Sequence, residues 1–166
     1  MFLFSGVAYA QQGNKDTKAI YKAAYLFSFT KLVDWPSSYK KGEFTIGLLA
    51  SEDTKNLYRE LRKKYEDKKV GDQSLTITEY SSPEEVDKGC NILFIGERST
   101  SSLGDLKRQN QSTLLVAERK GALQKGAVIN FVIKNNKLEY ELSRNNAERY
   151  GLTIGNQLRK LAYKVH

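Results

Sequence analysis

The sequence has very few of the residues that carry most enzyme chemistry. Its only histidine is His166, the last residue, and its only cysteine is Cys90. For practical purposes this excludes a His-based catalytic triad, a histidine general base and a multi-histidine metal site. Neither the P-loop pattern nor G-x-G-x-x-G occurs, and a hydrolase would need clustered carboxylates that the sequence does not reveal. We therefore expect no enzyme activity, no cofactor and no metal site.

Long hydrophobic runs and flexible linkers are also lacking. Residues 1–10, MFLFSGVAYA, are apolar and end in a small-x-small pattern at Ala8 and Ala10, and residues 11–15 are polar. Such a boundary is typical of signal peptidase cleavage. We interpret residues 1–10 as the remnant of a signal peptide, with a buried N-terminal strand as the alternative. Residues 11–166 are then expected to form a single exported, soluble domain.

A lone cysteine cannot form a disulfide within the chain. In an exported protein it is either buried and inert or paired with another chain. Because Cys90 directly precedes the apolar run 91–95, burial is the expected state.

The formal net charge of +8 would suit an anionic partner, but the basic residues are scattered. The densest group, residues 59–69, also contains Glu60, Glu66 and Asp67, which is typical of a solvated helix end. None of the nucleic-acid reader motifs is present. We predict no nucleic-acid binding.

What the sequence does have is an aromatic-rich apolar stretch over residues 16–36, around which we expect the chain to be organised. Asp16 or Thr17 can cap the start of a helix, and Pro36 is expected to end it at Trp35. Its aromatic content favours either a buried core helix or a partner-binding surface. As partner-binding candidates on this helix we take Tyr21, Tyr25, Phe29 and Trp35.

The rest of the chain alternates between strand and helix patterns. Strands are expected at 44–49, 75–80, 90–96 and 113–117, with helices at 51–65, from 82 to 89 and at 99–109. Such alternation indicates a parallel sheet. The predicted fold class is α/β: a three-layer domain with a mostly parallel central sheet, a C-terminal antiparallel hairpin and flanking helices.

The C-terminal part follows a different pattern. Strands 127–134 and 137–142 flank Asn135-Asn136, which indicates a hairpin. Asn145 or Asn146 is expected to cap a short helix that Gly151 ends, and a final helix is expected over 158–165. The second hairpin strand is predicted to be an exposed edge. That edge allows a homodimer, although Glu139 and Glu141 are charges that can block such pairing.

One candidate ligand site follows the most strand-like segment, 90–96. Open parallel sheets usually bind ligands beyond the carboxyl ends of their strands. Glu97, Arg98 and Ser99 lie at that position and are our candidates for binding a small anion or metabolite. The alternative is an ordinary polar loop with a serine cap.

Three segments together carry a family resemblance. Residues 22–36 match K-A-x-[YF]-[LI]-x-x-F-x-x-[FY]-x-x-W-P, with Leu32 at the second aromatic position, and residues 90–95 match C-x-[VI]-[LV]-[FY]-[IV]. A C-terminal block comprises residues 126–131, 138–142, 147, 151–152 and 158–162. In this order and spacing, the segments resemble the YfiR family of exported regulators.

The resemblance implies a periplasmic α/β protein without enzyme activity. The name-giving member binds the periplasmic domain of a membrane-bound diguanylate cyclase and holds it inactive, which lowers cyclic-di-GMP signalling and biofilm formation, and other relatives accompany sensor kinases. We therefore expect a partner of one of these two kinds. Tyr150, Leu152 and the final helix are a second candidate partner surface. The alternative function is that of a periplasmic small-molecule binding protein.

Two positions depart from the family pattern. Relatives often carry a cysteine in the first sheet strand, as partner to the one that Cys90 matches, where this chain has Gly47. The resemblance thus implies that a family disulfide is absent here, together with any redox control through it. The usual small serine pair before the last helix is replaced by Gly155-Asn156.

Overall fold

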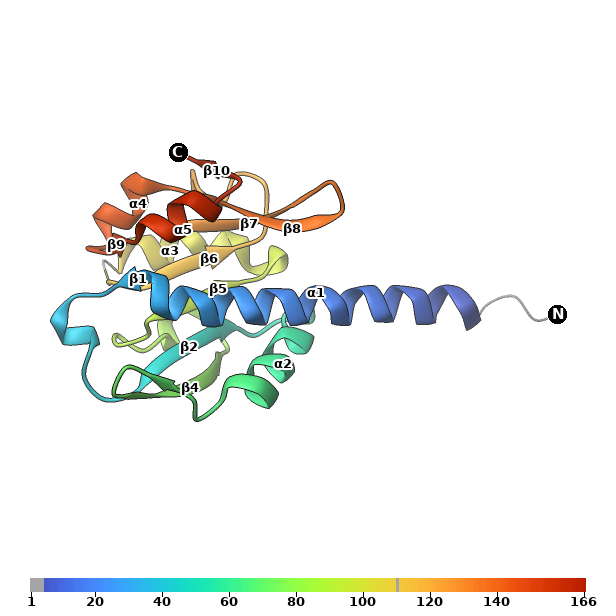
Figure 1. The fold of residues 1–166 in the computed structure, drawn as a ribbon, viewed down its shortest axis with the longest axis horizontal. Helices are drawn as coiled ribbons and strands as arrows, with labels where there is room; N and C mark the ends of the chain where they lie inside the picture. The colour runs from blue at the N-terminus through green and yellow to red at the C-terminus, as the bar shows by residue number, and fades with distance from the viewer. Residues whose placement is uncertain (1–4, 110) are drawn as a thin grey trace.

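The computed structural model describes the backbone of residues 5–109 and 111–166, and side chains from residue 15 onward except those of residues 16 and 110. It confirms the predicted α/β class: helices pack on both faces of an eight-stranded, mostly parallel sheet (Figure 1). A separate two-stranded sheet joins β1 (Val33–Asp34) to β9 (Thr153–Ile154).

The main sheet has a doubly wound order. Its strands β4, β2, β5, β6 and β7 are mutually parallel, and β8 closes an antiparallel hairpin with β7. In spatial order the strands are β10 (Lys164–Val165), β8 (Lys137–Leu142), β7 (Ile129–Lys134), β6 (Leu114–Ala117), β5 (Ile92–Ile95), β2 (Phe44–Leu49), β4 (Gln73–Tyr80) and β3 (Lys69–Val70). Because β5 follows β4 in the chain but lies beyond β2, the connections reverse direction between β2 and β5.

The helices form the two outer layers. On one face α1 (Ser5–Leu32) lies across the sheet, with α2 (Lys55–Tyr65) and α5 (Asn156–Leu161) on either side of it (Figure 1). The remaining helical segments are η1 (Ser37–Tyr39), η2 (Pro83–Glu85), η3 (Glu97–Ser102), α3 (Leu103–Arg108) and α4 (Arg144–Arg149). Within the described residues, no helix is long and apolar enough to cross a bilayer.

A cluster of aromatic rings joins α1 to the sheet. Phe29 is 0% exposed, and its ring centre lies 5.5 Å from that of Tyr140 on β8. Tyr25 contacts Phe131 on β7 at 5.7 Å, and Phe131 in turn contacts Phe94 on β5 at 6.2 Å. Such ring pairs add to the burial of apolar area. The organising stretch is therefore a core helix along most of its length.

The first helix starts and ends elsewhere than predicted. It begins at Ser5, before Asp16 and Thr17, because the intervening residues include several alanines and glutamines and no proline. It ends at Leu32, three residues before Trp35, because the chain then pairs with β9. The Leu32 carbonyl accepts a hydrogen bond of 2.9 Å from the N–H of Gly155. A Cβ on Gly155 would lie 2.8 Å from that oxygen, so the contact requires glycine.

The C-terminal segment also differs from expectation. The final helix ends at Leu161 rather than continuing to residue 165, because Lys164 and Val165 pair with β8 as β10. The predicted edge strand β8 is thereby covered. Helix α4 is capped by Ser143, whose side chain accepts from the Asn146 N–H, so the asparagines are not its cap.

The hairpin is confirmed. Lys134 pairs with Lys137, and both central residues of the two-residue turn, Asn135 and Asn136, have positive φ. Asparagine tolerates this geometry better than most residues.

We predict that core and surface positions of α1 differ sharply in their effect on stability. Phe29→Ala removes a fully buried ring and should lower the free energy of unfolding by about 3–5 kcal/mol. Tyr21→Ala, at an exposed position of the same helix, should change it by less than about 0.5 kcal/mol. Urea denaturation of both variants measures the difference; comparable losses would contradict the placement of α1.

Candidate functional site

The predicted ligand residues lie at the point where the connections reverse. Glu97, Arg98 and Ser99 begin η3, directly after β5, and Asp53 follows the neighbouring strand β2. Glu97 and Arg98 are exposed and Ser99 is half-buried. The sequence therefore placed these three residues correctly at the carboxyl ends of parallel strands, where ligand sites usually form.

A carboxylate of the chain itself occupies this position. The N–H of Arg98 donates to Asp53 Oδ2 at 3.2 Å, and the Ser51 hydroxyl donates to the other carboxylate oxygen. Burial alone would raise the pKa of Asp53, but these hydrogen bonds and the charge of Arg98 outweigh it and lower that pKa. A Cβ on Gly96 would lie 2.8 Å from Asp53 Oδ2. The Arg98 N–H, at the position where we expected a small anion or metabolite to bind, is thus already used by the chain itself.

A partly buried ion pair lies at the same end of the sheet. Lys22 of α1 pairs with Glu118, which follows β6, and both side chains are 15% exposed. The Lys22 ammonium also lies 5.7 Å from the centre of the Phe94 ring. Burial raises the pKa of Glu118; Lys22 opposes this shift, whereas Asp53 and Glu97 add to it. Lys22 was not singled out from the sequence, although its place in an apolar helix was a signal for burial.

The described residues contain no group of three or more acidic, histidine or cysteine side chains that could hold a metal ion.

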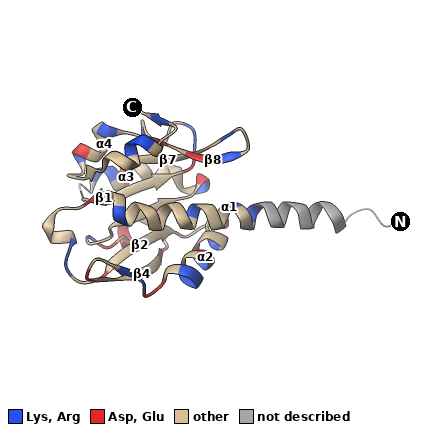
Figure 2. Ribbon diagram, in the orientation of Figure 1, with Lys and Arg blue, Asp and Glu red and all other residues tan. Residues whose placement is uncertain are grey.

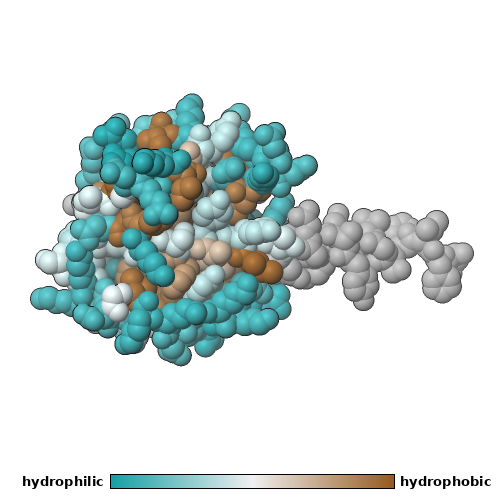
Figure 3. All heavy atoms as spheres, viewed as in Figure 1, coloured by the Kyte–Doolittle hydropathy of each residue, from teal (hydrophilic) through white to brown (hydrophobic). Residues whose placement is uncertain are grey.

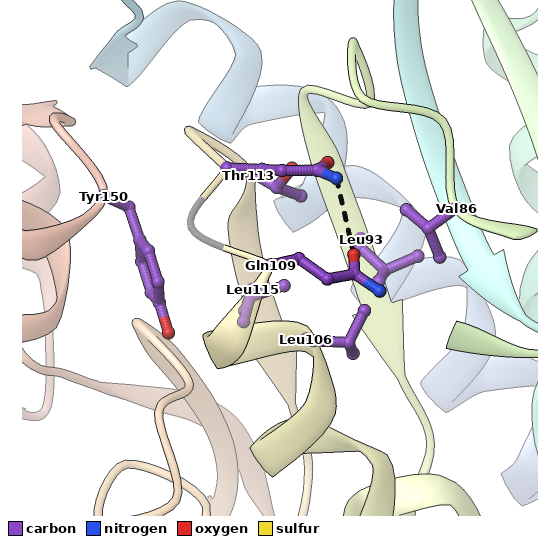
Figure 4. Close-up of a pocket in the computed structure, with 8 residues that line it drawn as sticks. Val86, Leu93, Leu106, Gln109, Thr113, Leu115 and Tyr150 are labelled. Atoms are coloured by element: carbon purple, nitrogen blue, oxygen red, sulfur yellow. Dashed lines mark hydrogen bonds between the residues drawn. The ribbon is translucent and has the colours of Figure 1, made fainter. Parts of the chain in front are cut away.

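A small cavity lies on the face of the sheet opposite α1, between Leu93, Leu106, Leu115 and Tyr150 (Figure 4). The volume of this cavity is about 10 Å³, which is room for one water molecule. This cavity is too small for a metabolite.

The predicted partner-binding residues are divided between surface and core. Tyr21 is 56% exposed, and Tyr25 is half-buried with its hydroxyl donating to the Leu138 carbonyl at 3.2 Å. The other four side chains are buried, namely Phe29, Trp35, Tyr150 and Leu152. Trp35 Nε1 donates to the Asn91 carbonyl at 3.1 Å, and the Tyr150 hydroxyl donates to the Gly126 carbonyl at 2.8 Å. These four side chains are therefore part of the core and not of the surface.

Exposed large apolar side chains gather on neighbouring elements. Within the described residues they are Ile20, Tyr21, Ile133, Leu161, Tyr163 and Val165. We call these six residues the apolar rim. They come from α1, the β7–β8 hairpin and the C-terminal α5–β10 segment, which contact one another. Figure 3 shows apolar residues over these elements on an otherwise mostly hydrophilic surface. Clustering of this kind marks interaction surfaces.

Of the apolar rim, Tyr21 was singled out by name from the sequence, and the final helix expected over 158–165 contains Leu161, Tyr163 and Val165. In the structure α5 ends at Leu161, and Val165 lies in β10 instead of the helix. In the face that Figure 2 shows, charged residues lie on most elements, α2 among them. One of them, Lys134, places its ammonium 5.0 Å from the centre of the Tyr163 ring.

Cys90 is fully buried, as predicted, and its thiol donates to the Ile92 carbonyl at 3.2 Å. A Cβ on Gly47 would lie 3.1 Å from the Cys90 sulfur but only 2.5 Å from a carbon of the Tyr80 ring. The Tyr80 ring therefore packs where a side chain at position 47 would lie.

Two solved structures share this fold at low sequence identity. A conserved domain protein from Vibrio cholerae aligns with a TM-score of 0.54 and 10% identity, over 74% of this chain and 54% of that one. An ABC domain in complex with L-Trp, from Streptococcus pneumonia, aligns with a TM-score of 0.51 and 13% identity, over 74% of this chain and 55% of that one. The chain thus spans about half the length of each, and the likeness concerns the fold alone.

Among curated proteins, no match to the sequence is found. A family model described as YfiR/HmsC-like matches residues 20–163. This range contains all three segments that carry the resemblance noted in the sequence, and it confirms that resemblance.

We predict that Lys22→Met lowers the free energy of unfolding by about 3 kcal/mol at about pH 7, because it leaves a buried carboxylate without its cation. The folded-state pKa of Glu118 is raised above its ordinary value of 4.5. The stability that comes from the protonated form of Glu118 is therefore present below pH 4.5 and is lost as the pH rises through the folded-state pKa. The deficit of the variant should accordingly shrink as the pH falls toward 4.5.

The matched control is Lys31→Met, at an exposed position of the same helix, which should change stability by less than about 0.5 kcal/mol. Denaturation curves of both variants at several pH values measure the effect. Equal, pH-independent losses would show that Lys22 and Glu118 are not coupled.

We also predict that the Cys90 thiol reacts with a thiol reagent only as fast as the chain unfolds. Burial raises its pKa to about 12 from an ordinary 9.0. The stability that depends on the neutral thiol is therefore present below pH 9.0 and is lost as the pH rises toward 12. Labelling rates with and without denaturant test this; rapid labelling of the native chain would contradict burial.

Proposed function

This chain belongs to the YfiR/HmsC-like family, and we propose that it is a periplasmic regulatory protein that binds a membrane signalling enzyme through the apolar rim. The partner is the periplasmic domain of a diguanylate cyclase or of a sensor kinase. Binding holds that enzyme in one activity state, so the chain controls signalling, including cyclic-di-GMP output and biofilm formation, without catalysing a reaction itself.

The observation that carries this proposal is the apolar rim. Its members are 37–56% exposed, although the chain buries most of its other large apolar side chains. Leaving them in water costs roughly 25 cal/mol for each Å² that a partner would cover. Tyrosine is among the residue types enriched in protein interfaces, and Tyr21 and Tyr163 supply two of the six rim residues.

Residues beneath the apolar rim fix the position of the elements that carry it. Phe29 holds α1 on the sheet through its ring contacts with Phe131 and Tyr140. Tyr25 links the helix to the hairpin through Leu138, which pairs with the rim residue Ile133. In this proposal Tyr25, Phe29, Trp35, Tyr150 and Leu152 affect partner binding through the position of the elements they anchor.

The test uses a double substitution, Tyr21→Glu with Leu161→Glu, which places two charges in the apolar rim. In cells that lack the native gene, the wild-type chain should restore the normal cyclic-di-GMP level and crosslink to a membrane diguanylate cyclase or sensor kinase. The double variant should do neither, because loss of interface anchors weakens binding by at least about tenfold.

A matched control, Ser38→Glu with Ser81→Glu, adds the same charge at exposed positions outside the elements that carry the rim and should behave as wild type. Thermal melts verify that both variants fold. Gel filtration detects a change of oligomeric state. The proposal fails if the rim variant regulates normally, or if its effect is only to dissociate a homodimer while the membrane enzyme is still captured.

A further inference from the structure

Four cationic side chains converge on a hollow that has no part in the proposed function. Lys107 and Arg108 come from α3, Lys125 from the loop after β6, and Arg149 from α4. The hollow has a volume of about 730 Å³, and its other lining residues are Ser101, Gly104 and Gln124. We call this the basic hollow. None of its lining residues belongs to the apolar rim or to the pair of strand ends at β2 and β5.

Most of this positive charge is not neutralised within the chain. Arg108 pairs with Asp105 in the same helix. For Lys107, Lys125 and Arg149, the described residues provide no ion pair. Cations are common in the last turns of helices, where they offset the helix dipole. That accounts for the cations at the ends of α3 and α4 but not for Lys125, which comes from a loop to line the same concavity.

The frame that carries these cations is fixed. Gly126 has φ +117, and a Cβ there would lie 3.1 Å from the Lys107 side chain. The absence of a side chain lets the Lys107 stem lie against the backbone. The hydroxyl of Tyr150 donates to the Gly126 carbonyl at 2.8 Å. The Asn146 amide donates to the carbonyls of Leu123 at 2.8 Å and Ala127 at 2.7 Å, so the loop that carries Lys125 is tied to α4.

We propose that the basic hollow binds phosphate groups, and that it takes either a compact anion or adjacent lipid headgroups that together present at least two negative charges. Arginine guanidinium groups and lysine ammonium groups are the usual phosphate ligands. Cations on three separate segments can surround a compact polyanion, and the concavity excludes part of the water that would screen them. The same chemistry would bind a soluble diphosphate or the headgroup of an anionic lipid, and the two sources are separable by experiment.

A second hollow provides the matched control. It lies on α2, has a volume of about 570 Å³, and is lined by Arg59, Arg62 and Lys63 together with Glu66 and Asp67. Its acidic residues offset its basic ones, so it should not bind an anion. Removing Arg59 and Lys63 of this hollow and the adjacent Lys68, with Arg59→Gln, Lys63→Gln and Lys68→Gln, lowers the net charge by as much as Lys107→Gln, Lys125→Gln and Arg149→Gln does in the basic hollow.

The experiment is isothermal titration of the full chain with inorganic pyrophosphate, in parallel with flotation on vesicles of phosphatidylcholine with or without phosphatidylglycerol. Wild type and the α2 triple variant should bind one of these probes with affinities that agree within about twofold. The triple variant of the basic hollow should lose at least about tenfold, because charge-assisted hydrogen bonds are removed. Thermal melts confirm that both variants fold.

Binding of pyrophosphate in solution would identify a soluble phosphate ligand. Binding only to phosphatidylglycerol vesicles, lost in the hollow variant, would identify a lipid headgroup. Equal losses in the two triple variants would show that attraction to net charge alone is at work and would overturn the proposal. Failure of wild type to bind either probe would overturn it as well.

Discussion

The packing of α1 across the sheet is the constraint on which the rest of the structure depends. Its inward side chains Ala23, Leu26 and Phe29 are fully buried, and Lys22 forms an ion pair with Glu118 beyond β6. Because a helix has a limited number of faces, fixing these residues inward turns Ile20 and Tyr21 outward. The same helix therefore completes the core and presents part of the surface that we propose for partner binding.

The strand ends, where a sheet of this order usually binds ligands, are filled by the chain's own charged groups. Asp53 accepts the backbone N–H of Arg98, and the pair of Lys22 and Glu118 lies beside it. Removing one partner of such a pair is strongly destabilising. The surfaces that we propose for binding, the apolar rim and the basic hollow, lie elsewhere on the molecule.

Much of the fold follows from local patterns. The parallel strands, the hairpin turn at Asn135 and Asn136, and the burial of Cys90 were all predicted. The predicted helix ends are wrong where the chain pairs instead with a strand that is distant in the sequence. Strand β9 ends α1 early, and the free edge of β8 takes Val165 from the expected helix. The candidate site was harder to predict, because aromatic content does not distinguish Phe29 in the core from Tyr21 at the surface, and exposure of Leu161 depends on where α5 ends.

The central claim, that the apolar rim contacts a membrane signalling enzyme, is tested most directly by photocrosslinking in cells. A photoreactive phenylalanine analogue would replace Leu161 in the rim or, as a control, the exposed Ser81 that follows β4. The account predicts that the analogue at position 161 crosslinks to the periplasmic domain of a diguanylate cyclase or sensor kinase, and that the analogue at position 81 does not. Equal crosslinking from both positions, or none from position 161 in a folded and exported protein, would contradict it.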